Sequence, residues 1–301
     1  MAQPDLSVCI VNWNTRQDLE EAIASVLASD PGLNLEVIVL DNASTDDSAD
    51  MVRNRFPGVK LLESAENLGF ARGYNRAARE ASGRHLLVLN PDTVVRMGAL
   101  RRLVEFMDSQ PDAGAAGPWL LNPDGTLQFS CRHFPTPMAA ILRNTFLGRL
   151  LPRNRFTRSY LMADWDHTTA QPVDWVSGAA ICIRRETWER VGGFDERFFM
   201  YAEDIDWCLR AQQAGWTVYY VPDAVIVHRI GRSSDQRPFP MVVEFHRSMA
   251  RFYRKHYACK WPPGLRLLPI IGIWARAGLV VLQTMLRRSW DRVAGAWVSR
   301  T

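Results

Sequence analysis

Cysteine is scarce in this sequence and is not grouped. Five cysteines are scattered over 301 residues, and no two of them form a CxxC pair or have the spacing of a metal finger. Such a distribution argues against a disulfide framework and against a zinc site built on cysteine. We therefore expect a reducing compartment and buried free thiols.

The beginning of the sequence lacks the features of a secretory leader. Residues 1–5 contain no basic region, and the apolar segment that follows is short and has no small-residue cleavage site. Internal repeats and low-complexity tracts are missing as well, and 47% hydrophobic with 23% charged residues is ordinary for a folded protein. These absences favour a folded cytoplasmic protein of one large domain or two modest ones.

Acidic residues are nearly missing from the last part of the sequence. Residues 251–301 hold ten Lys or Arg and one acid, Asp291, so their net charge is +9 while residues 1–250 carry −5. A basic end on a mildly acidic body predicts an anionic partner. We exclude nucleic acid as that partner, because the basic region is too apolar and contains no recognisable binding motif.

Apolar runs alternate with helical patterns through the first third of the sequence. Strands are predicted at 6–12, 35–41, 59–63 and 84–90, and helices at 16–28, 47–55 and 70–82. The strand candidates are continuous apolar runs, which are typical of a parallel sheet covered by helices on both faces. We predict an α/β fold with a mostly parallel sheet. Further along, the pattern predicts a strand in 173–186, two short strands in 216–228 around Pro222, and an amphipathic helix over 240–257.

Polar residues directly follow three of the predicted strands. They are Asn12 with Asn14, Asp41, and Asn90 with Asp92. In a parallel α/β sheet these positions share the edge at which ligands bind. Each residue could instead cap the next helix, but three such groups at one edge favour a site. Asp41 suits contact with a base or ribose, and Asp92 suits a divalent cation such as Mg²⁺ or Mn²⁺.

Two further segments offer ligands of the same kind. The sequence NLGFARGYN, residues 67–75, places Gly69 and Arg72 near a helix start, where backbone N–H groups and positive charge can meet a phosphate. A simple loop-to-helix turn would have the same sequence pattern. His228 ends an apolar run and is either a metal ligand or a structural histidine.

The segment YAEDIDWCLR, residues 201–210, gathers three carboxylates in four positions. Asp206 and Arg210 are four residues apart and can form an ion pair on a helix. Glu203 lies where the dipole of a helix N-terminus favours negative charge. Aromatic neighbours should desolvate Asp204 and raise its pKa, which suits a general base. An ordinary charged helix start is the alternative interpretation.

These motifs carry a resemblance to a known family. The segments VIVNWNTRQDLEEAIASVL, VIVLDNASTDDS, ENLGFARGYN and LLVLNPDTVV resemble the N-terminal motifs of family-2 glycosyltransferases of the GT-A fold. VDWVSGAAICIRRETWERVGGFDERFFMYAEDIDWCLRAQQAGW and VIVHRIGRSS resemble the acceptor half of that family. The match covers about residues 5–235 in order. Within the family, the forms NPDT and NPDGTLQ look like bacterial rhamnosyltransferases of cell-wall and surface-polysaccharide assembly.

The resemblance implies an inverting transfer of a sugar from a nucleotide diphosphate donor to an acceptor hydroxyl. Asp204 takes the place of the catalytic base, while Asp92 and His228 take the places of metal ligands for Mg²⁺ or Mn²⁺. The first position of the family's DxD motif is Asn90 here, which puts the strength of metal binding in doubt. The nucleotide-binding positions implied by the resemblance are Asn12, Asn14, Asp41, Asn67, Gly69, Arg72 and Asp92. The acceptor-binding positions are Trp175, Ser177, Gly178 and Glu203.

The end of the chain has its own pattern. Twenty residues between Arg266 and Arg287 contain one charge, Arg276. This length suits a membrane span, but a central Arg argues against a simple one. Tryptophans among basic residues favour a helix lying at an anionic membrane surface. Packing on the catalytic domain or at an oligomer interface is the alternative.

Together the patterns predict a catalytic domain at 1–238 and a basic helical region at 239–301. The nucleotide-sugar half would span about 1–118 and the acceptor half about 119–238. We expect a glycosyltransferase on the inner face of the cell membrane that uses a dTDP- or UDP-sugar, plausibly dTDP-rhamnose, and a lipid-linked or polysaccharide acceptor. A homo-oligomer is possible. The alternatives are a metal-dependent nucleotidyltransferase, which needs no distant base, and a non-catalytic nucleotide-sugar-binding or scaffold protein, which Asn90 would favour.

Overall fold

The computed structural model describes residues 2–136, 139, 142, 150–151, 154–229 and 238–298, with side chains described as far as residue 285. The chain divides into two compact units. The first comprises Met1–Phe199 with Glu203–Ser233, and the second Met200–Ala202 with Ser234–Thr301. The two units are described separately.

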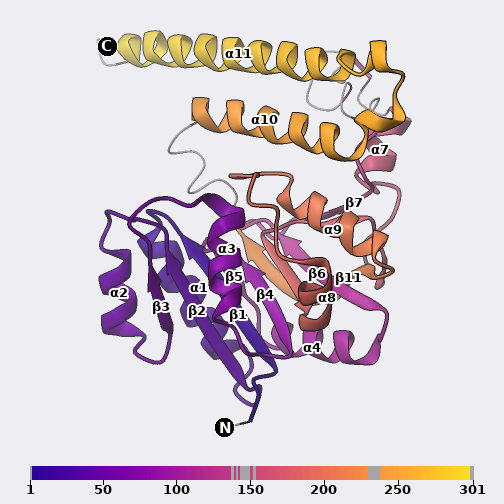
Figure 1. The fold of residues 1–301 in the computed structure, drawn as a ribbon. Helices are drawn as coiled ribbons and strands as arrows, with labels where there is room; N and C mark the ends of the chain where they lie inside the picture. The colour runs from indigo at the N-terminus through magenta and orange to yellow at the C-terminus, as the bar shows by residue number, and fades with distance from the viewer. Residues whose placement is uncertain are drawn as a thin grey trace. The chain divides into compact units, whose positions relative to one another are not determined.

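The first unit begins as a parallel sheet (Figure 1). Strand β1 (Leu6–Asn12) lies between β2 (Leu35–Asp41) and β4 (His85–Leu89), and β3 (Lys60–Glu63) extends the sheet beyond β2. All three pairings are parallel, so the carboxyl ends of these strands lie at one edge. The parallel α/β half predicted from the apolar runs is confirmed.

Helices cover both faces of this sheet because alternate strand residues point to opposite sides. Leu6, Val8 and Ile10 join one buried cluster with apolar residues of α1, α2 and α4. Val11 points the other way, against Gly73 of α3. The helices are α1 (Arg16–Ser29), α2 (Ser48–Arg55), α3 (Gly69–Arg79) and α4 (Ala99–Ser109).

The second half of the sheet is mixed. Its strands are β5 (Thr93–Val95), β6 (Ala113–Leu121), β8 (Gln171–Pro172), β10 (Ala180–Arg184) and β11 (Thr217–His228), with β7 (Cys131–Arg132) and β9 (Trp175–Val176) forming a separate pair. Strand β10 is antiparallel to β4 and β6, while β11 runs parallel to β6 and antiparallel to β5. The order along the main path is β3-β2-β1-β4-β10-β6-β11-β5. Helices α7 (Arg155–Tyr160), α8 (Arg185–Val191) and α9 (Glu203–Gln213) complete this half.

Two strand predictions in this half were wrong in detail. The segment 173–186 is not one strand, because residues 177–179 leave the ladder between β9 and β10. Conversely, 216–228 forms one strand rather than two, with a register shift between Val221 and Val225. Pro222 lies within that irregularity, where its missing N–H interrupts no ladder bond.

The second unit is a pair of helices, α10 (Pro238–His256) and α11 (Leu268–Val298), joined by short 3₁₀ turns at Ala258–Lys260 and Pro263–Leu265. The helices lie side by side (Figure 1). Residues Pro263–Met285 are long and apolar enough to cross a membrane, by length and composition, and most of them are exposed. Of the five cysteines, the four in the first unit are buried as predicted, but Cys259 is exposed.

Candidate active site

The ends of β1 and β2 are joined by side chains. Asn12 donates Nδ2 to Asp41 Oδ1 at 3.2 Å and to Ser44 Oγ at 3.1 Å, and Asp41 Oδ2 accepts the N–H of Ser44 at 3.0 Å. Neither residue caps a helix, because the N-cap positions of α1 and α2 are Thr15 and Asp47. Asn12 and Asp41 therefore form a buried polar platform at the sheet edge.

Asn14 fixes the loop above this platform. Its φ of 52° lies in the left-handed region, which asparagine tolerates better than most residues. Its Oδ1 accepts the N–H of Thr45 at 2.7 Å, and its own N–H donates to Ser44 Oγ at 3.0 Å. The loops after β1 and β2 are thus held to each other.

Three consecutive N–H groups at the start of α3 are already hydrogen-bonded within the fold. The N–H of Leu68 donates to Asn42 Oδ1 at 2.8 Å, that of Gly69 to Asn67 Oδ1 at 2.9 Å, and that of Phe70 to the carbonyl of Phe199 at 2.7 Å. The N–H groups of residues 68–70 are therefore not free for a phosphate.

Gly69 has a different reason to be glycine. Its φ is +76°, and a Cβ there would lie 2.4 Å from the carbonyl oxygen of Phe199. The residue therefore allows residue 199 to approach the start of α3. Arg72 remains half-exposed, 3.9 Å from Glu66 and 4.0 Å from Glu196, and can still supply positive charge.

The end of β4 meets the end of β11 around two buried side chains, Asp92 and His228. His228 Nδ1 donates to Gln128 Oε1 at 2.7 Å, because the amide oxygen can only accept. In the tautomer with its proton on Nδ1, the ring presents the lone pair of Nε2, which lies 3.3 Å from Asp92 Oδ1. Asp92 Oδ1 is buried and receives no hydrogen bond within the described part of the chain. In this tautomer two hydrogen-bond acceptors face each other, and a bound cation would satisfy both of them.

Asn90 and Tyr74 border this pair. Asn90 Nδ2 lies 3.5 Å from His228 Nε2, so the Asn90 side chain stands beside the histidine. Tyr74 is buried in α3 and donates to the carbonyl of Leu89 at 2.8 Å. Burial, with the charges of Asp92 and Glu203 adding to it, raises the pKa of Tyr74 well above its usual value, so the phenol stays a donor.

Asp204 lies at the start of α9, after two residues with left-handed backbone, Tyr201 (φ 70°) and Ala202 (φ 65°). Its Oδ2 accepts the N–H of Gly178 at 2.9 Å and its Oδ1 that of Ile205 at 2.8 Å. Burial raises the pKa of Asp204, while these amides and the charge of Arg132 oppose that rise. The side chain keeps partial exposure to solvent. A carboxylate of this kind can accept a proton.

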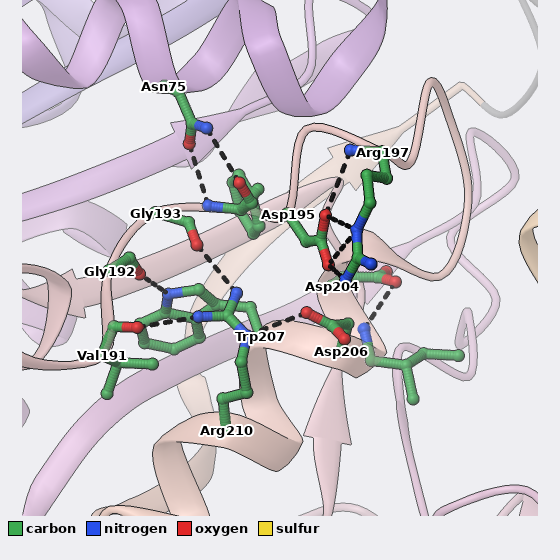
Figure 2. Close-up of polar contacts among 12 residues, drawn as sticks. Asn75, Val191, Gly192, Gly193, Asp195, Arg197, Asp204, Asp206, Trp207 and Arg210 are labelled. Carbon is green, nitrogen blue, oxygen red and sulfur yellow. Dashed lines mark hydrogen bonds and ion pairs between the residues drawn. The ribbon is translucent and has the colours of Figure 1, made fainter. Parts of the chain in front are cut away.

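Asp206, two residues further on, is in a different environment (Figure 2). It is fully buried and accepts Nε of Arg210 at 2.9 Å, so the predicted ion pair is confirmed. The other guanidinium nitrogens of Arg210 donate to the carbonyls of Val191 and Gly193. Trp207 donates to the carbonyl of Gly192 at 2.9 Å. This face of α9 fixes the loop after α8.

Of the predicted acceptor positions, Gly178 contacts Asp204, and two others are buried. Gly178 donates directly to it, and the N–H of Ser177 holds the carbonyl of Ser130 at 2.7 Å. Trp175 and Glu203 are each 4% exposed. Trp175 donates Nε1 to the carbonyl of His133 and supports its neighbours rather than presenting a free ring.

Known proteins are similar to this chain in sequence and in fold. The model of the family described as Glycosyl transferase family 2 matches residues 7–166. N-acetylglucosaminyl-diphospho-decaprenol L-rhamnosyltransferase of Mycobacterium tuberculosis is 32% identical over 299 residues, covering 95% of this chain and 96% of that protein. The chain belongs to glycosyltransferase family 2. Rhamnosyltransferase WbbL of Escherichia coli is 29% identical, covering 73% of this chain and 82% of that protein.

Solved structures place the family-2 enzyme among glycosyltransferases of the GT-A fold. The mannosyltransferase PcManGT from Pyrobaculum calidifontis, in complex with GDP-Man and Mn²⁺, has a TM-score of 0.56 at 20% identity, covering 92% of this chain and 70% of that chain. GalNAc-T7 with UDP, GalNAc and Mn²⁺ has a TM-score of 0.59 at 17% identity, covering 82% and 47%. Family membership decides against the nucleotidyltransferase and the scaffold protein.

The residues of this glycosyltransferase fit a divalent cation between Asp92 and His228. The unbonded Asp92 Oδ1 and the lone pair of Nε2 would hold it. No group of three His, Cys, Asp or Glu able to hold a metal occurs in the described ranges, so the donor diphosphate and water would complete the shell. When bound, the cation supplies positive charge to the departing diphosphate.

Three contributors to the site of this glycosyltransferase were not found from the sequence. Gln128 ends the segment NPDGTLQ, and it orients His228 from 100 residues away. Tyr74 and Arg132 gave no local signal that separates them from core or surface residues. Their roles arise from pairings between distant segments, which no periodicity in the sequence reveals.

Proposed function

We propose that this glycosyltransferase transfers L-rhamnose from dTDP-rhamnose to a lipid-linked diphosphate acceptor in the synthesis of a bacterial surface glycan. The observation that carries the proposal is the 32% identity to the mycobacterial rhamnosyltransferase, which extends over nearly the full length of both chains. The name dTDP-rhamnosyl transferase of a Shigella flexneri relative, 25% identical over 73% of this chain, supports the donor.

In the proposed reaction, the donor binds at the sheet edge and the acceptor is deprotonated at the start of α9. At the sheet edge, Asn12 and Asp41 would hold the nucleoside, and Asp92 and His228 would hold Mg²⁺ or Mn²⁺, which supplies positive charge to the departing diphosphate. At the start of α9, Asp204 takes the proton from the acceptor hydroxyl. The hydroxyl oxygen forms a bond to C1 of rhamnose as the bond from C1 to the diphosphate oxygen breaks. Attack from the face opposite the leaving group inverts C1.

Transfer assays with purified protein test this proposal. Wild-type enzyme, dTDP-rhamnose, MnCl₂ and a polyprenyl diphosphate N-acetylglucosamine should yield a product one rhamnose heavier by mass spectrometry. Asp204→Asn should lower kcat about 10²- to 10⁴-fold, because it removes the general base. Asp164→Asn, an exposed carboxylate that pairs with Arg158, is the control and should leave kcat unchanged. Undiminished transfer by Asp204→Asn would disprove the assignment of the base, and no turnover of dTDP-rhamnose by wild type would disprove the donor.

We also propose that the α10–α11 pair attaches the enzyme to the inner face of the cell membrane. The central charge of the apolar stretch, Arg276, donates to His246 Nε2 of α10 at 3.1 Å and lies over the ring of Phe245. His246 can accept because its Nδ1 proton is given to the carbonyl of Val242. Arg276 is thereby turned toward protein and away from the exposed face of α11.

That exposed face has the composition of a membrane-binding surface. Its large apolar side chains are Leu268, Ile271, Trp274, Leu279, Leu282 and Met285. With ten basic residues and one acid in residues 251–301, it suits an anionic leaflet.

Vesicle flotation tests the attachment. Ile271→Glu with Leu282→Glu should abolish binding to vesicles of phosphatidylglycerol and phosphatidylcholine, because both carboxylates would enter the hydrocarbon boundary. Gln283→Glu, which adds a charge at another exposed position of α11, is the control. Equal flotation of all three proteins would refute the membrane role of this face.

A further inference from the structure

Arg132 is an arginine near the proposed base that forms no ion pair with the residues that the structure describes. It stands in β7, beside Trp175 of β9, and its guanidinium lies 5.0 Å from the centroid of the Trp175 ring and 5.8 Å from that of Tyr160. Nη2 donates to the carbonyl of Phe129 at 2.9 Å, while Nε is buried without a hydrogen bond. Within the described ranges, no carboxylate lies within ion-pair distance of Arg132. Some other arginines in this half form ion pairs, as Arg158 does with Asp164 and Arg210 with Asp206, whereas Arg184 donates to backbone carbonyls.

The surroundings of Arg132 connect it to Asp204. Strand β9 pairs with β7 and continues into Ser177 and Gly178. Ser177 bonds the carbonyl of Ser130, two residues before Arg132, and Gly178 bonds Asp204. The charge of Arg132 also reaches Asp204, where it opposes the effect of burial on the pKa of that carboxyl.

The aromatic rings hold the guanidinium in one place. Stacking on the Trp and Tyr faces leaves Nη1 and the second hydrogen of Nη2 to donate to an oxyanion, since Nη2 gives one hydrogen to Phe129 and Nε is buried. Because the side chain is already ordered, binding an anion there costs little further rotamer entropy. An arginine so fixed and without a carboxylate is prepared for an anionic ligand.

The direction of the reaction decides which anion this is. In an inverting displacement the base and the acceptor lie on the face of the donor sugar opposite the leaving diphosphate. A cation on the side of the base therefore meets the acceptor and not the nucleotide. We propose that Arg132 binds the diphosphate of the lipid-linked acceptor, an inference that rests on the proposed function for the identity of that acceptor.

Paired acceptors test this role. With a polyprenyl diphosphate N-acetylglucosamine, Arg132→Gln should raise the acceptor KM about 10- to 100-fold, the range for losing a hydrogen-bonded charge. With octyl N-acetylglucosaminide, which has no phosphate, the KM of Arg132→Gln and wild type should agree within about twofold. The KM for the nucleotide-sugar should not change. Arg132→Lys should recover part of the loss, and Arg158→Gln should behave as wild type.

A binding measurement separates this inference from the proposed transfer activity. Farnesyl diphosphate, titrated calorimetrically in EDTA so that no metal site contributes, should bind wild type and not Arg132→Gln. Binding by both proteins, or an equal rise in KM for both acceptors, would overturn the proposal. So would an unchanged KM with a shift in the acidic limb of the pH profile, because that result would assign Arg132 to the ionisation of Asp204. If farnesyl diphosphate binds through Arg132 but wild type transfers no rhamnose, the proposed donor is wrong and the anion site stands.

Discussion

Asp206 in α9 and Asp92 after β4 are both buried carboxylates, yet their surroundings differ. Asp206 meets the guanidinium of Arg210, whose remaining nitrogens donate to backbone carbonyls, so its charge is balanced inside the fold. Asp92 instead lies beside His228 Nε2, and its Oδ1 receives no hydrogen bond from the residues that the structure describes. The first arrangement stabilises the fold, whereas the second leaves an acceptor that the proposed cation would satisfy.

Asp204 resembles Asp92 more than its neighbour Asp206. Its recorded hydrogen bonds come from two backbone N–H groups, and part of its surface stays open to solvent. Removal of a structural carboxylate should therefore destabilise the protein. Removal of a site carboxylate should impair function while leaving stability unchanged or higher, a trade-off common at active sites.

The largest expected effect is the loss of stability when the structural carboxylate Asp206 is removed. Asp206→Ala should lower the free energy of unfolding by about 3–5 kcal/mol, because it leaves the largely buried guanidinium of Arg210 without its partner. Urea denaturation followed by circular dichroism measures this change. The double variant Asp206→Ala with Arg210→Met should recover part of the loss. A loss below about 1 kcal/mol would remove the distinction between the two carboxylates.

In contrast to Asp206→Ala, the variant Asp92→Asn should lose activity and keep its stability. Transfer should fall about 100-fold or more, because the cation supplies several kcal/mol of transition-state stabilisation. Its melting temperature without ligands should equal or exceed that of wild type. The rise in melting temperature on adding MnCl₂ with dTDP should shrink, since a ligand stabilises only what it binds. An undiminished rise would show that Asp92 does not hold the metal.

A smaller effect is expected for Gln128, which contacts the proposed metal ligand His228 and not the metal itself. Gln128→Leu removes the acceptor that fixes the tautomer of His228, so metal affinity should fall about 10- to 100-fold. Gln128→Glu keeps an acceptor at that position and should retain most of the affinity. Manganese titrations of activity give both values. Equal affinities in Gln128→Leu and wild type would mean that His228 is oriented without Gln128.

The smallest effect concerns the pH dependence of stability. Burial raises the pKa of Asp204 above its usual 3.8, so the native state binds more protons than the unfolded state between these two pKa values. Stability should therefore fall as pH rises through that interval and stay level above it. Asp204→Asn lacks this loss, so its free energy of unfolding should increase relative to that of wild type as pH rises through the interval. A stability difference that does not vary between pH 3 and 8 would contradict the raised pKa.

Local patterns predicted what is local in the molecule. The bounds of β1 and β2, the helix from Glu203, and the Asp206–Arg210 pair follow from apolar periodicity and from the four-residue spacing on a helix. The resemblance placed Asp92, His228 and Asp204 in the chain. It did not give their partners, because these come from other segments.

Tertiary structure alone decided the rest of the site. The N–H groups of residues 68–70 looked free for a phosphate, but Asn42, Asn67 and Phe199 use them. Gln128 reaches His228, and Arg132 lies near Asp204, only because the sheet brings together segments about 100 and 70 residues apart in the sequence. The sequence by itself determined which elements form and which chemical groups stand at their ends. Which of those groups stay unpaired depends on every neighbour that folding brings to them, since a polar atom becomes available to a ligand only when no other part of the chain satisfies it.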